Sequence, residues 1–383
     1  MSYTLDEVAF LRDNATAIDV AEADLEMTKK GHLRDVAKLQ AQFGDYGRAV
    51  AELLKARRSG KLPQDWLMDH DSAQQATAPA VAEYRAQFLK ARGVDLVHDL
   101  TCSIGTEGQA YAPGTYVGSD LDASRVAMAQ HNIEHPVFRA DALTTTTTAR
   151  VCLADPARRQ GGKRITRLDE LLPPPQDLLD SHGELAIKCA PGIDHSEWEG
   201  LACVVSLDGG VKETCLYTPG LGTGKRAVVL SSTPEGLHTD IIEDDLDEDE
   251  LPEAGPIGRF LIDPDGAIVR AGLVRYYAAR EGLHQLDSRI AYLTGERLPE
   301  GTSGFEFIEM VPMRKLKAAM AAHDVGSLEI LVRGQDVDPD QLRKKLKLKG
   351  STAKTLVVTR IGAKGVAVLC GPRVVSTEGN YAP

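Results

Sequence analysis

The sequence lacks the features that would place the protein in a membrane or outside the cell. None of its apolar runs approaches the ~20 residues that a membrane-spanning helix needs. Its first ten residues carry Asp6 and Glu7, where an export signal has a basic cap followed by an apolar stretch. The six cysteines are scattered, and no two have the CxxC spacing of a zinc or redox site. We therefore expect reduced thiols, no metal site, no membrane association and a cytoplasmic location.

Aromatic residues are also scarce, at 5% of the chain, and acidic residues outnumber basic ones. The formal net charge of −12 argues against a surface that binds nucleic acid throughout. The charge is uneven, because residues 306–383 contain 13 Lys and Arg against 8 Asp and Glu. A polyanion-binding surface is therefore expected only in this C-terminal part.

Hydrophobic periodicity divides the 383 residues into four parts. Apolar residues recur at helical spacing through residues 1–72, which predicts an all-helical N-terminal domain. Residues 73–235 alternate short apolar runs with helical segments, which is the pattern of a doubly wound α/β sheet. Residues 236–304 begin with an acidic stretch and are expected to form a loop and connecting segment, and residues 305–383 a small basic α+β domain.

Seven apolar runs in the second part predict the strands of this sheet, and several of them end in a carboxylate. The predicted strands are Val94–Asp99, Tyr116–Asp120, Val137–Asp141, Val151–Asp155, Glu184–Cys189, Ala202–Leu207 and Ala227–Ser232. The last two have no long helical spacer, and the glycine-rich turn signals between them favour an antiparallel pair at one edge of the sheet.

The stretch from Asp99 to Gly105 predicts a ligand site at the carboxyl edge of the sheet. A strand that ends in Asp99, followed by small residues around Gly105 and then a helix, allows backbone N–H groups to approach a ligand. The dinucleotide fingerprint needs glycine where Cys102 or Ser103 stands, which disfavours a pyrophosphate cradle for NAD. We therefore expect a nucleotide-like ligand of another kind.

Further carboxylates follow at the ends of the next predicted strands. Asp120 ends the second strand, 21 residues after Asp99, where a carboxylate accepts hydrogen bonds from ribose hydroxyls. Asp141 ends the third, where its side chain can accept a hydrogen bond from an adenine amino group. Asp155 ends the fourth, followed by Pro156. Each aspartate alone also suits a helix N-cap, but four at consecutive strand ends indicate a functional site.

These segments resemble the motifs of class I S-adenosylmethionine-dependent methyltransferases. The resemblance is carried by Asp99-Leu-Thr-Cys-Ser-Ile-Gly-Thr106, Gly118-Ser-Asp-Leu-Asp-Ala-Ser124, Ala129-Gln-His-Asn132 and Ala140-Asp-Ala-Leu143. The chain is similar to the bacterial group with a THUMP-like C-terminal domain, which itself resembles trimethylguanosine synthases. This wider resemblance includes Gln75-Ala-Thr77, Asp155-Pro-Ala-Arg-Arg159, Lys188-Cys-Ala-Pro-Gly-Ile193 and Arg333-Gly334. It implies a Rossmann-like seven-stranded sheet, S-adenosylmethionine as cofactor and no metal.

The resemblance also implies roles for individual residues. The cofactor-binding set that it implies is Gln75, Thr77, Asp99, Thr101, Cys102, Ile104, Gly105, Asp120 and Asp141. Within this set Asp99 would face the cofactor's ammonium group, Asp120 its ribose and Asp141 its adenine amine. Gln75 and Thr77 would contact its carboxylate end.

The resemblance assigns catalysis to Asp155, Pro156 and Arg158. Amino-group methyltransferases usually carry Asp/Asn-Pro-Pro-aromatic here, and the acidic or amide oxygen and the first proline carbonyl accept hydrogen bonds from the target nitrogen. In this chain Ala157 and Arg158 replace the second proline and the aromatic residue. Arg158 can stack on a base or pair with a phosphate, or it can have a structural role by bridging loop carboxylates.

The C-terminal part predicts alternating strands and helices with a basic cluster. Its expected elements are strands at Phe305–Val311, Ser327–Val332, Thr355–Arg360 and Val366–Leu369 and helices at Met313–Ala322 and Asp338–Lys347. The residues expected to contact RNA phosphates are Arg333, Arg343, Lys344, Lys345, Lys347 and Lys349. The alternative for this cluster is a solvated amphipathic segment.

The leading hypothesis is a methyltransferase that acts on a base nitrogen of rRNA or tRNA. A methyltransferase for a protein or a small molecule is the alternative within enzymes. A catalytically silent RNA-binding or assembly factor is the alternative outside them, because the fourth-strand motif departs from the usual pattern.

Overall fold

The computed structural model describes residues 3–26, 28, 30–156, 159–160, 163–164, 167–377 and 380–382. Ala157 and Arg158 of the predicted catalytic motif lie outside these residues. The chain forms two compact units, which are residues 1–224 with 230–239 and residues 225–229 with 240–383. Among the described residues, no helix is both long and apolar enough to cross a lipid bilayer.

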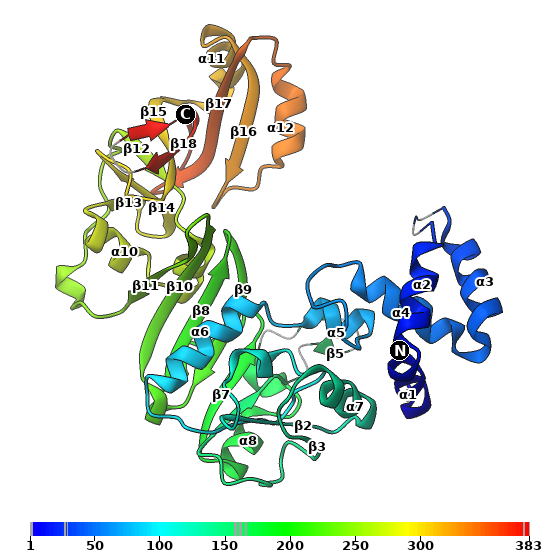
Figure 1. Cartoon of the computed structure of the whole chain (residues 1–383). Helices are drawn as coiled ribbons and strands as arrows, with labels where there is room; N and C mark the ends of the chain where they lie inside the picture. The colour runs from blue at the N-terminus through cyan, green and yellow to red at the C-terminus, as the bar shows by residue number, and fades with distance from the viewer. Residues whose placement is uncertain are drawn as a thin grey trace. The chain divides into compact units, whose positions relative to one another are not determined.

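The first unit begins with short helices, drawn in blue to cyan in Figure 1. They are α1 (Leu5–Asp13), α2 (Ala15–Ala23), α3 (His32–Phe43), α4 (Gly47–Arg57), α5 (His70–Gln75) and α6 (Pro79–Lys90). A capping box starts α1, because Thr4 and Glu7 each accept a hydrogen bond from the other's backbone N–H. Leu53 and Met68 share one hydrophobic core with Tyr116 of the sheet. The N-terminal helices are therefore packed into the same compact unit as the sheet.

The described residues contain a nine-stranded sheet. Its order is β11 (Gly236–Glu243), β10 (Gly224–Thr233), β8 (Leu201–Leu207), β9 (Gly210–Tyr217), β7 (Glu184–Cys189), β4 (Val151–Ala154), β1 (Val97–Asp99), β2 (Tyr116–Asp120) and β3 (Val137–Arg139). The neighbours from β7 to β3 are parallel, whereas β9 is antiparallel to both β7 and β8. Helices α7 (Ala123–Asn132) and α8 (Pro175–Ser181) and a small hairpin, β5 (Arg159–Gln160) with β6 (Lys163–Arg164), complete this part. The parallel half brings the carboxyl ends of β1, β2 and β4 to one edge.

The sheet differs from the predicted one at its other edge. The sequence predicts seven strands, with Ala202–Leu207 and Ala227–Ser232 joined directly, and it misses β9 and β11. β9 lies between β8 and β7. Its apolar pattern is interrupted by Glu213, which is buried only because it pairs with Arg85 at 2.6 Å. β10 lies beside β8, but an additional strand separates the two in sequence.

The second unit contains a sheet of eight strands within the described ranges. They are β13 (His284–Asp287), β14 (Ile290–Gly295), β12 (Phe260–Ile262), β15 (Ser303–Val311), β18 (Lys364–Thr377), β17 (Thr352–Ile361) and β16 (Val325–Val332), with β19 (Asn380–Ala382) paired to β18. Its helices are α9 (Gly266–Ala271), α10 (Val274–Glu281), α11 (Leu316–Ala322) and α12 (Pro339–Leu346). Leu316 and Leu346 pack on one face of this sheet. Residues 236–304, expected as a loop and connecting segment, supply β12, β13 and β14 to it.

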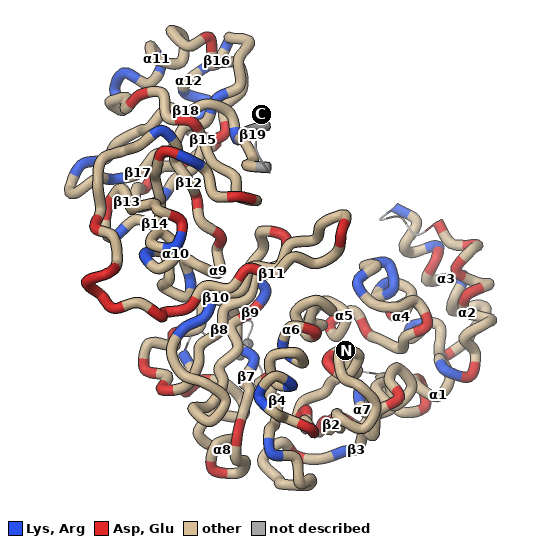
Figure 2. Tube along the Cα trace, turned by 60° about the vertical axis from the view of Figure 1, so that its left-hand side comes forward, with Lys and Arg blue, Asp and Glu red and all other residues tan. Residues whose placement is uncertain are grey.

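The acidic stretch 240–250 (red in Figure 2) is held by arginines of the same unit. Arg280 donates to both carboxylate oxygens of Asp240, at 2.7 and 2.8 Å. Nη1 of Arg275 donates to one carboxylate oxygen of Glu248, Oε1. These ion pairs hold the stretch on the surface of its unit, so it is not a purely solvated loop.

Candidate active site

Residues Thr101–Gly105 form a tight loop between β1 and the 3₁₀ helix η2 (Glu107–Ala110). Ser103 and Gly105 both have positive φ, 50° and 89°. A Cβ on Gly105 would lie 3.0 Å from Cδ1 of Ile133, so both its backbone angle and its surroundings require glycine. The loop therefore packs closely against Ile133, the residue after α7. Such a tight turn is expected of a ligand-binding loop at the carboxyl edge of a parallel sheet.

Asp99, the last residue of β1, is buried, and both of its carboxylate oxygens accept hydrogen bonds. The Tyr116 hydroxyl donates to Oδ2 at 3.0 Å, and the Thr101 backbone N–H donates to Oδ1 at 3.1 Å. Burial raises the pKa of Asp99 to about 7, although the nearby Lys188 ammonium acts in the opposite direction. A buried carboxylate of this kind suits a ligand cation, because the cation would stabilise its ionised form.

Asp120 shapes the same loop from the end of β2. Its Oδ2 accepts a hydrogen bond from the backbone N–H of Ser103 at 3.0 Å, and its Oδ1 accepts one from that of Asp122 at 2.9 Å. A carboxylate has about four acceptor positions, so these two bonds fix Asp120 and leave capacity for ligand hydroxyls. Asp141 lies two residues beyond the end of β3 and is exposed, and its Oδ1 accepts a hydrogen bond from the backbone of Leu143 at 2.9 Å.

The remaining predicted cofactor residues divide by burial. Gln75 is exposed at the end of α5, whereas Thr77 is buried. Lys61 fixes this segment, because its ammonium group donates to the carbonyl oxygens of Gln74 and Ala76.

The side chains of Cys102 and Ile104 are 3% and 1% exposed and belong to the hydrophobic core. Burial raises the pKa of the Cys102 thiol well above its usual value, so the group stays a neutral thiol. The side chains of both residues anchor the loop in the core, so the loop presents their backbone groups, and not their side chains, to a ligand.

Asp155 follows β4 directly and contacts two polar residues there, Thr101 and Lys188. Its backbone N–H donates to Oγ1 of Thr101 at 2.7 Å. Its Oδ2 lies 3.2 Å from Nζ of Lys188, a buried residue of β7 that also donates to Oγ1 of Thr77 at 2.6 Å. Pro156, the next predicted catalytic residue, is buried. Residues predicted for cofactor binding and for catalysis therefore meet at the carboxyl ends of β1, β4 and β7.

A charged network beneath this group escaped the sequence analysis. Arg85 of α6 is 1% exposed and pairs with two buried carboxylates, Glu213 at 2.6 Å and Glu107 at 3.2 Å. Lys188 joins the network because its Nζ lies 3.9 Å from Oε2 of Glu107. The only signal in the sequence is a charged residue inside an otherwise apolar segment, as with Glu213 in β9.

Asn132, the last residue of α7, ties the N-terminal segment to the loop. Its Oδ1 accepts a hydrogen bond from the backbone N–H of Leu67 at 2.8 Å, and its Nδ2 donates to the carbonyl oxygens of Leu67 and Ile104, both at 2.9 Å. One amide side chain therefore connects three segments of the chain.

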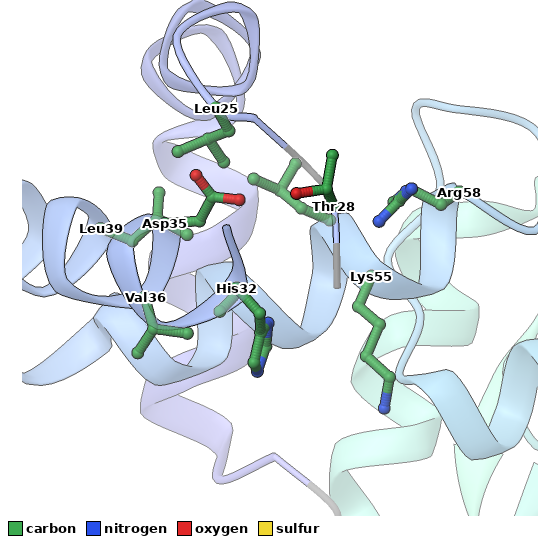
Figure 3. Close-up of a pocket in the computed structure, with 10 residues that line it drawn as sticks. Leu25, Thr28, His32, Asp35, Val36, Leu39, Lys55 and Arg58 are labelled. Atoms are coloured by element: carbon green, nitrogen blue, oxygen red, sulfur yellow. The ribbon is translucent and has the colours of Figure 1, made fainter. Parts of the chain in front are cut away.

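A hollow of about 370 Å³ lies beside the candidate site, between α6 and η2. It is lined by Pro79, Ala82, Glu83, Thr106, Gln109 and Ala110. A smaller hollow of about 50 Å³ lies among the N-terminal helices (Figure 3), and its lining shares no residue with the predicted cofactor and catalytic sets. In the described part of the chain, no group of three or more His, Cys, Asp or Glu residues is arranged to hold a metal ion.

Five of the predicted RNA-contacting residues lie in or just after α12 and are exposed (blue in Figure 2). Arg343, Lys344 and Lys345 occupy its last turn, and Lys347 and Lys349 follow. Lysines at this end of a helix also interact favourably with the helix dipole, so a structural reason for them exists beside phosphate contact.

Arg333 differs from the four lysines because its guanidinium is engaged within the second unit, as is that of Arg343, whose Nη1 lies 2.6 Å from Oδ1 of Asp340. Nη1 of Arg333 donates to the carbonyl oxygen of Ala291 at 2.7 Å and lies 2.9 Å from Oδ1 of Asp263. The guanidinium also lies over the ring of Tyr292, 4.7 Å from its centroid. These contacts of Arg333 link the end of β16 to β14 and to the residue after β12, which are not its neighbours in the sheet order.

Comparison with known proteins identifies the family of the chain. Residues 302–372 match the family described as THUMP domain-like. An uncharacterised S-adenosylmethionine-dependent methyltransferase of Mycobacterium tuberculosis (strain H37Rv) is 42% identical over 369 residues, which cover 87% of this chain and 99% of the relative. The protein of strain CDC 1551 gives the same values. The crystal structure of a protein from Porphyromonas gingivalis W83, described as a putative methyltransferase, shares the fold, with a TM-score of 0.72 and 20% identity over 97% of this chain and 99% of that chain. The chain therefore belongs to the S-adenosylmethionine-dependent methyltransferases, uses S-adenosylmethionine as its cofactor and carries a THUMP-like domain in its C-terminal part.

Proposed function

We propose that this enzyme methylates a base nitrogen of rRNA or tRNA. The observation that carries the proposal is the position of Asp155 and Pro156 directly beyond β4, with the Asp155 backbone N–H bonded to Thr101 of the cofactor loop at 2.7 Å. In amino-group methyltransferases the acidic oxygen and proline carbonyl at this place accept hydrogen bonds from the target nitrogen. A THUMP-like domain that carries five exposed basic residues in or after α12 supports RNA as the molecule that presents this nitrogen.

The residues around the loop fit the cofactor chemically. Asp99 offers a buried carboxylate to the ammonium group, and its raised pKa indicates that no charge in the protein fully compensates it. Asp120 offers acceptors to the ribose hydroxyls and Asp141 to the adenine amine. Gln75 and Thr77 are proposed to contact the carboxylate end. S-adenosylmethionine supplies, when bound, a methyl group activated by its sulfonium.

The chain's own contribution to methyl transfer is alignment and proton removal. Asp155 is proposed to accept a hydrogen bond from the target N–H and to take its proton as the new N–C bond forms. This orients the nitrogen lone pair for an in-line displacement, and pre-alignment of the reacting atoms is the main term that a protein can supply to such a step. Pro156 would offer its carbonyl oxygen as a second acceptor, and Arg158 would pair with a phosphate or stack on the base.

In the THUMP-like domain, Arg343, Lys344, Lys345, Lys347 and Lys349 are proposed to contact RNA phosphates. The internal contacts of Arg333 favour a structural contribution from that residue instead.

The proposal is tested by comparing modified nucleosides in cells with and without the gene. Total rRNA and tRNA are digested to nucleosides and compared by mass spectrometry, and the deletion strain is complemented with the wild type or with Asp155→Ala. We expect one N-methylated nucleoside to disappear on deletion and to return with the wild type only. Unchanged nucleosides in every RNA fraction, from a protein that binds S-adenosylmethionine in calorimetry, would show that RNA is not the substrate.

A further inference from the structure

Lys188 has a position that the proposed roles of its neighbours do not explain. It is 6% exposed, although a lysine is rarely buried without a charged partner. Its ammonium group contacts Thr77 at 2.6 Å, Asp155 at 3.2 Å and Glu107 at 3.9 Å. Thr77 belongs to the predicted cofactor-binding set and Asp155 to the predicted catalytic set. The lysine therefore contacts one residue proposed to bind the cofactor and one proposed to bind the target nitrogen.

We propose that Lys188 is a positioning residue that holds the Asp155 carboxylate ionised and oriented toward the target nitrogen, and that it links this carboxylate through Thr77 to the cofactor's carboxylate end. The inference rests on the proposed role of Asp155 as the acceptor for the target N–H.

The register of β4 against β7 brings the side chains of Asp155 and Lys188 together. β4 and β7 are parallel neighbours, and their register pairs Ala154 with Ile187. Asp155 and Lys188 are each one residue further along, so the backbones of two adjacent strands bring their side chains together. The backbone N–H of Asp155 is also bonded to Thr101. Its backbone position is therefore fixed by Thr101, and the direction of its carboxylate is fixed by Lys188. Such fixed placement is what a group that aligns a substrate requires.

The charge of Lys188 is stable in these surroundings. Burial lowers the pKa of a lysine, but the carboxylates of Asp155 and Glu107 outweigh this effect, and the pKa of Lys188 is raised above its usual value. Lys188 is therefore an ammonium ion at neutral pH and cannot act as the base itself. Proton removal stays with Asp155, which suits a substrate that presents an N–H donor.

Removal of the Lys188 ammonium group would take away a positive charge 3.2 Å from the Asp155 carboxylate. Among the described residues, the charged groups that act on the Lys188 ammonium include Asp155, Glu107 of η2, Arg85 of α6 and Glu213 of β9, and Lys188 in turn acts on Asp99 of β1. Arg85 is already shared by Glu107 and Glu213. Without the ammonium group, which favours the ionised carboxylate, the pKa of Asp155 rises, and a protonated Asp155 can no longer accept the target's proton.

The titration of Asp155 in the full-length chain saturated with S-adenosylhomocysteine tests the inference directly. Its ¹³Cγ resonance is assigned as the one lost in Asp155→Asn. We expect Lys188→Met to move the Asp155 titration upward by about one pH unit or more, and Lys188→Arg to move it much less, because a cation remains. An unchanged titration in a folded Lys188→Met protein overturns the inference, whatever its activity.

Methyl transfer to bulk RNA from cells that lack the gene supplies the second readout. As the pH is lowered, kcat of Lys188→Met should begin to fall about one pH unit or more above the pH at which kcat of the wild type begins to fall. At pH values below both titrations the variant should have lost roughly tenfold more of its kcat than the wild type, because one pKa unit corresponds to a tenfold change in the ionised fraction there. A merely structural role predicts an equal loss at every pH and a matching loss of S-adenosylhomocysteine affinity, and that outcome also rejects the inference.

The two proposals fail in different ways. A shifted titration, with no transfer to RNA by the wild type, leaves the inference on Lys188 intact and removes the RNA substrate. Should Lys188→Met not fold, Thr77→Val serves as the second variant, because it removes the hydroxyl that anchors the ammonium group but keeps its charge. It should shift the Asp155 titration in the same direction by less, and no shift in this variant counts against the link through Thr77.

Discussion

The buried carboxylate of Asp99 predicts that cofactor affinity depends on pH in the acidic to neutral range. Its pKa is raised to about 7 because it is buried. Only the ionised form can pair with the cofactor's ammonium group, so protons compete with the cofactor for this site. Affinity should therefore rise with pH and level off once Asp99 is ionised.

The size of the effect follows from two titrations. With a pKa of about 7, the ionised fraction of Asp99 increases from ~3% at pH 5.5 to ~75% at pH 7.5. The α-amino group of the cofactor begins to lose its proton near the upper limit, because such groups have pKa values of ~7.7–8.0, and this reduces the net gain to roughly 15-fold. Above about pH 8 the loss of the ammonium charge should weaken binding again.

Calorimetric titration of the full-length chain with S-adenosylmethionine across this range measures the effect. Tyr116→Phe removes the hydrogen bond to the ionised carboxylate, a contact worth ~1.5–3 kcal/mol, and so raises the pKa of Asp99 by about one to two units. At pH 7 that shift corresponds to a roughly 5- to 50-fold loss of affinity, which should be recovered at higher pH until the amine itself titrates.

Asp99→Asn is the matched control, since its amide does not titrate. Its affinity should be weak and nearly constant between about pH 5.5 and 7.5. A wild-type affinity that is constant over the same range would refute the reasoning, because either Asp99 is then ionised throughout or it does not face the ammonium group.

Three further predictions concern separate parts of the chain. Asp120→Ala should weaken S-adenosylmethionine more than tenfold in calorimetry, since it loses ~1.5–3 kcal/mol per charged hydrogen bond, whereas Asp141→Asn keeps an acceptor and should cost less; the reverse order would contradict the assignment. Arg85→Met leaves two buried carboxylates without their cation and should lower the free energy of unfolding by about 3–5 kcal/mol in urea titrations; a change below about 1 kcal/mol would mean that the network is not as buried as described. Combined charge reversal at Lys345 and Lys347 should flatten the slope of log affinity for single-stranded RNA against log salt by roughly one to two units, with cofactor affinity unchanged; an unaltered slope would assign these lysines to a solvated surface.

The parallel half of the sheet is predictable from sequence because its strands are buried on both faces. Val151–Ala154 and Glu184–Cys189 are short apolar runs, and the structure has them as β4 and β7. β9 is not predictable in this way, because Glu213 interrupts its pattern and becomes acceptable only through Arg85, 128 residues earlier in the chain. Partners so distant in sequence leave no local signal.

The candidate site divides along the same line. Asp99, Asp120 and Asp155 are found from sequence because strand ends converge at one edge of a parallel sheet, whatever the details of packing. The scattered cysteines are predicted to be reduced core thiols, and Cys102 is buried in the core. Side-chain direction within a tight loop depends on backbone angles that composition does not reveal, so the sequence could not show that the Cys102 side chain, which the resemblance places in the cofactor set, points away from the loop. The pairing of Asp155 with Lys188 requires the register of β4 against β7, which is fixed only in the folded sheet.

The amide of Asn132 makes the N-terminal helices and the cofactor loop thermodynamically dependent on each other. Because the same side chain is bonded to Leu67 and Ile104, local opening of either segment breaks bonds that hold the other. A cofactor that orders the loop therefore also stabilises the chain around Leu67 against hydrogen exchange. Coupling between two binding events is reciprocal. A substrate that binds and orders the N-terminal helices therefore raises cofactor affinity by the same factor by which the cofactor raises affinity for that substrate.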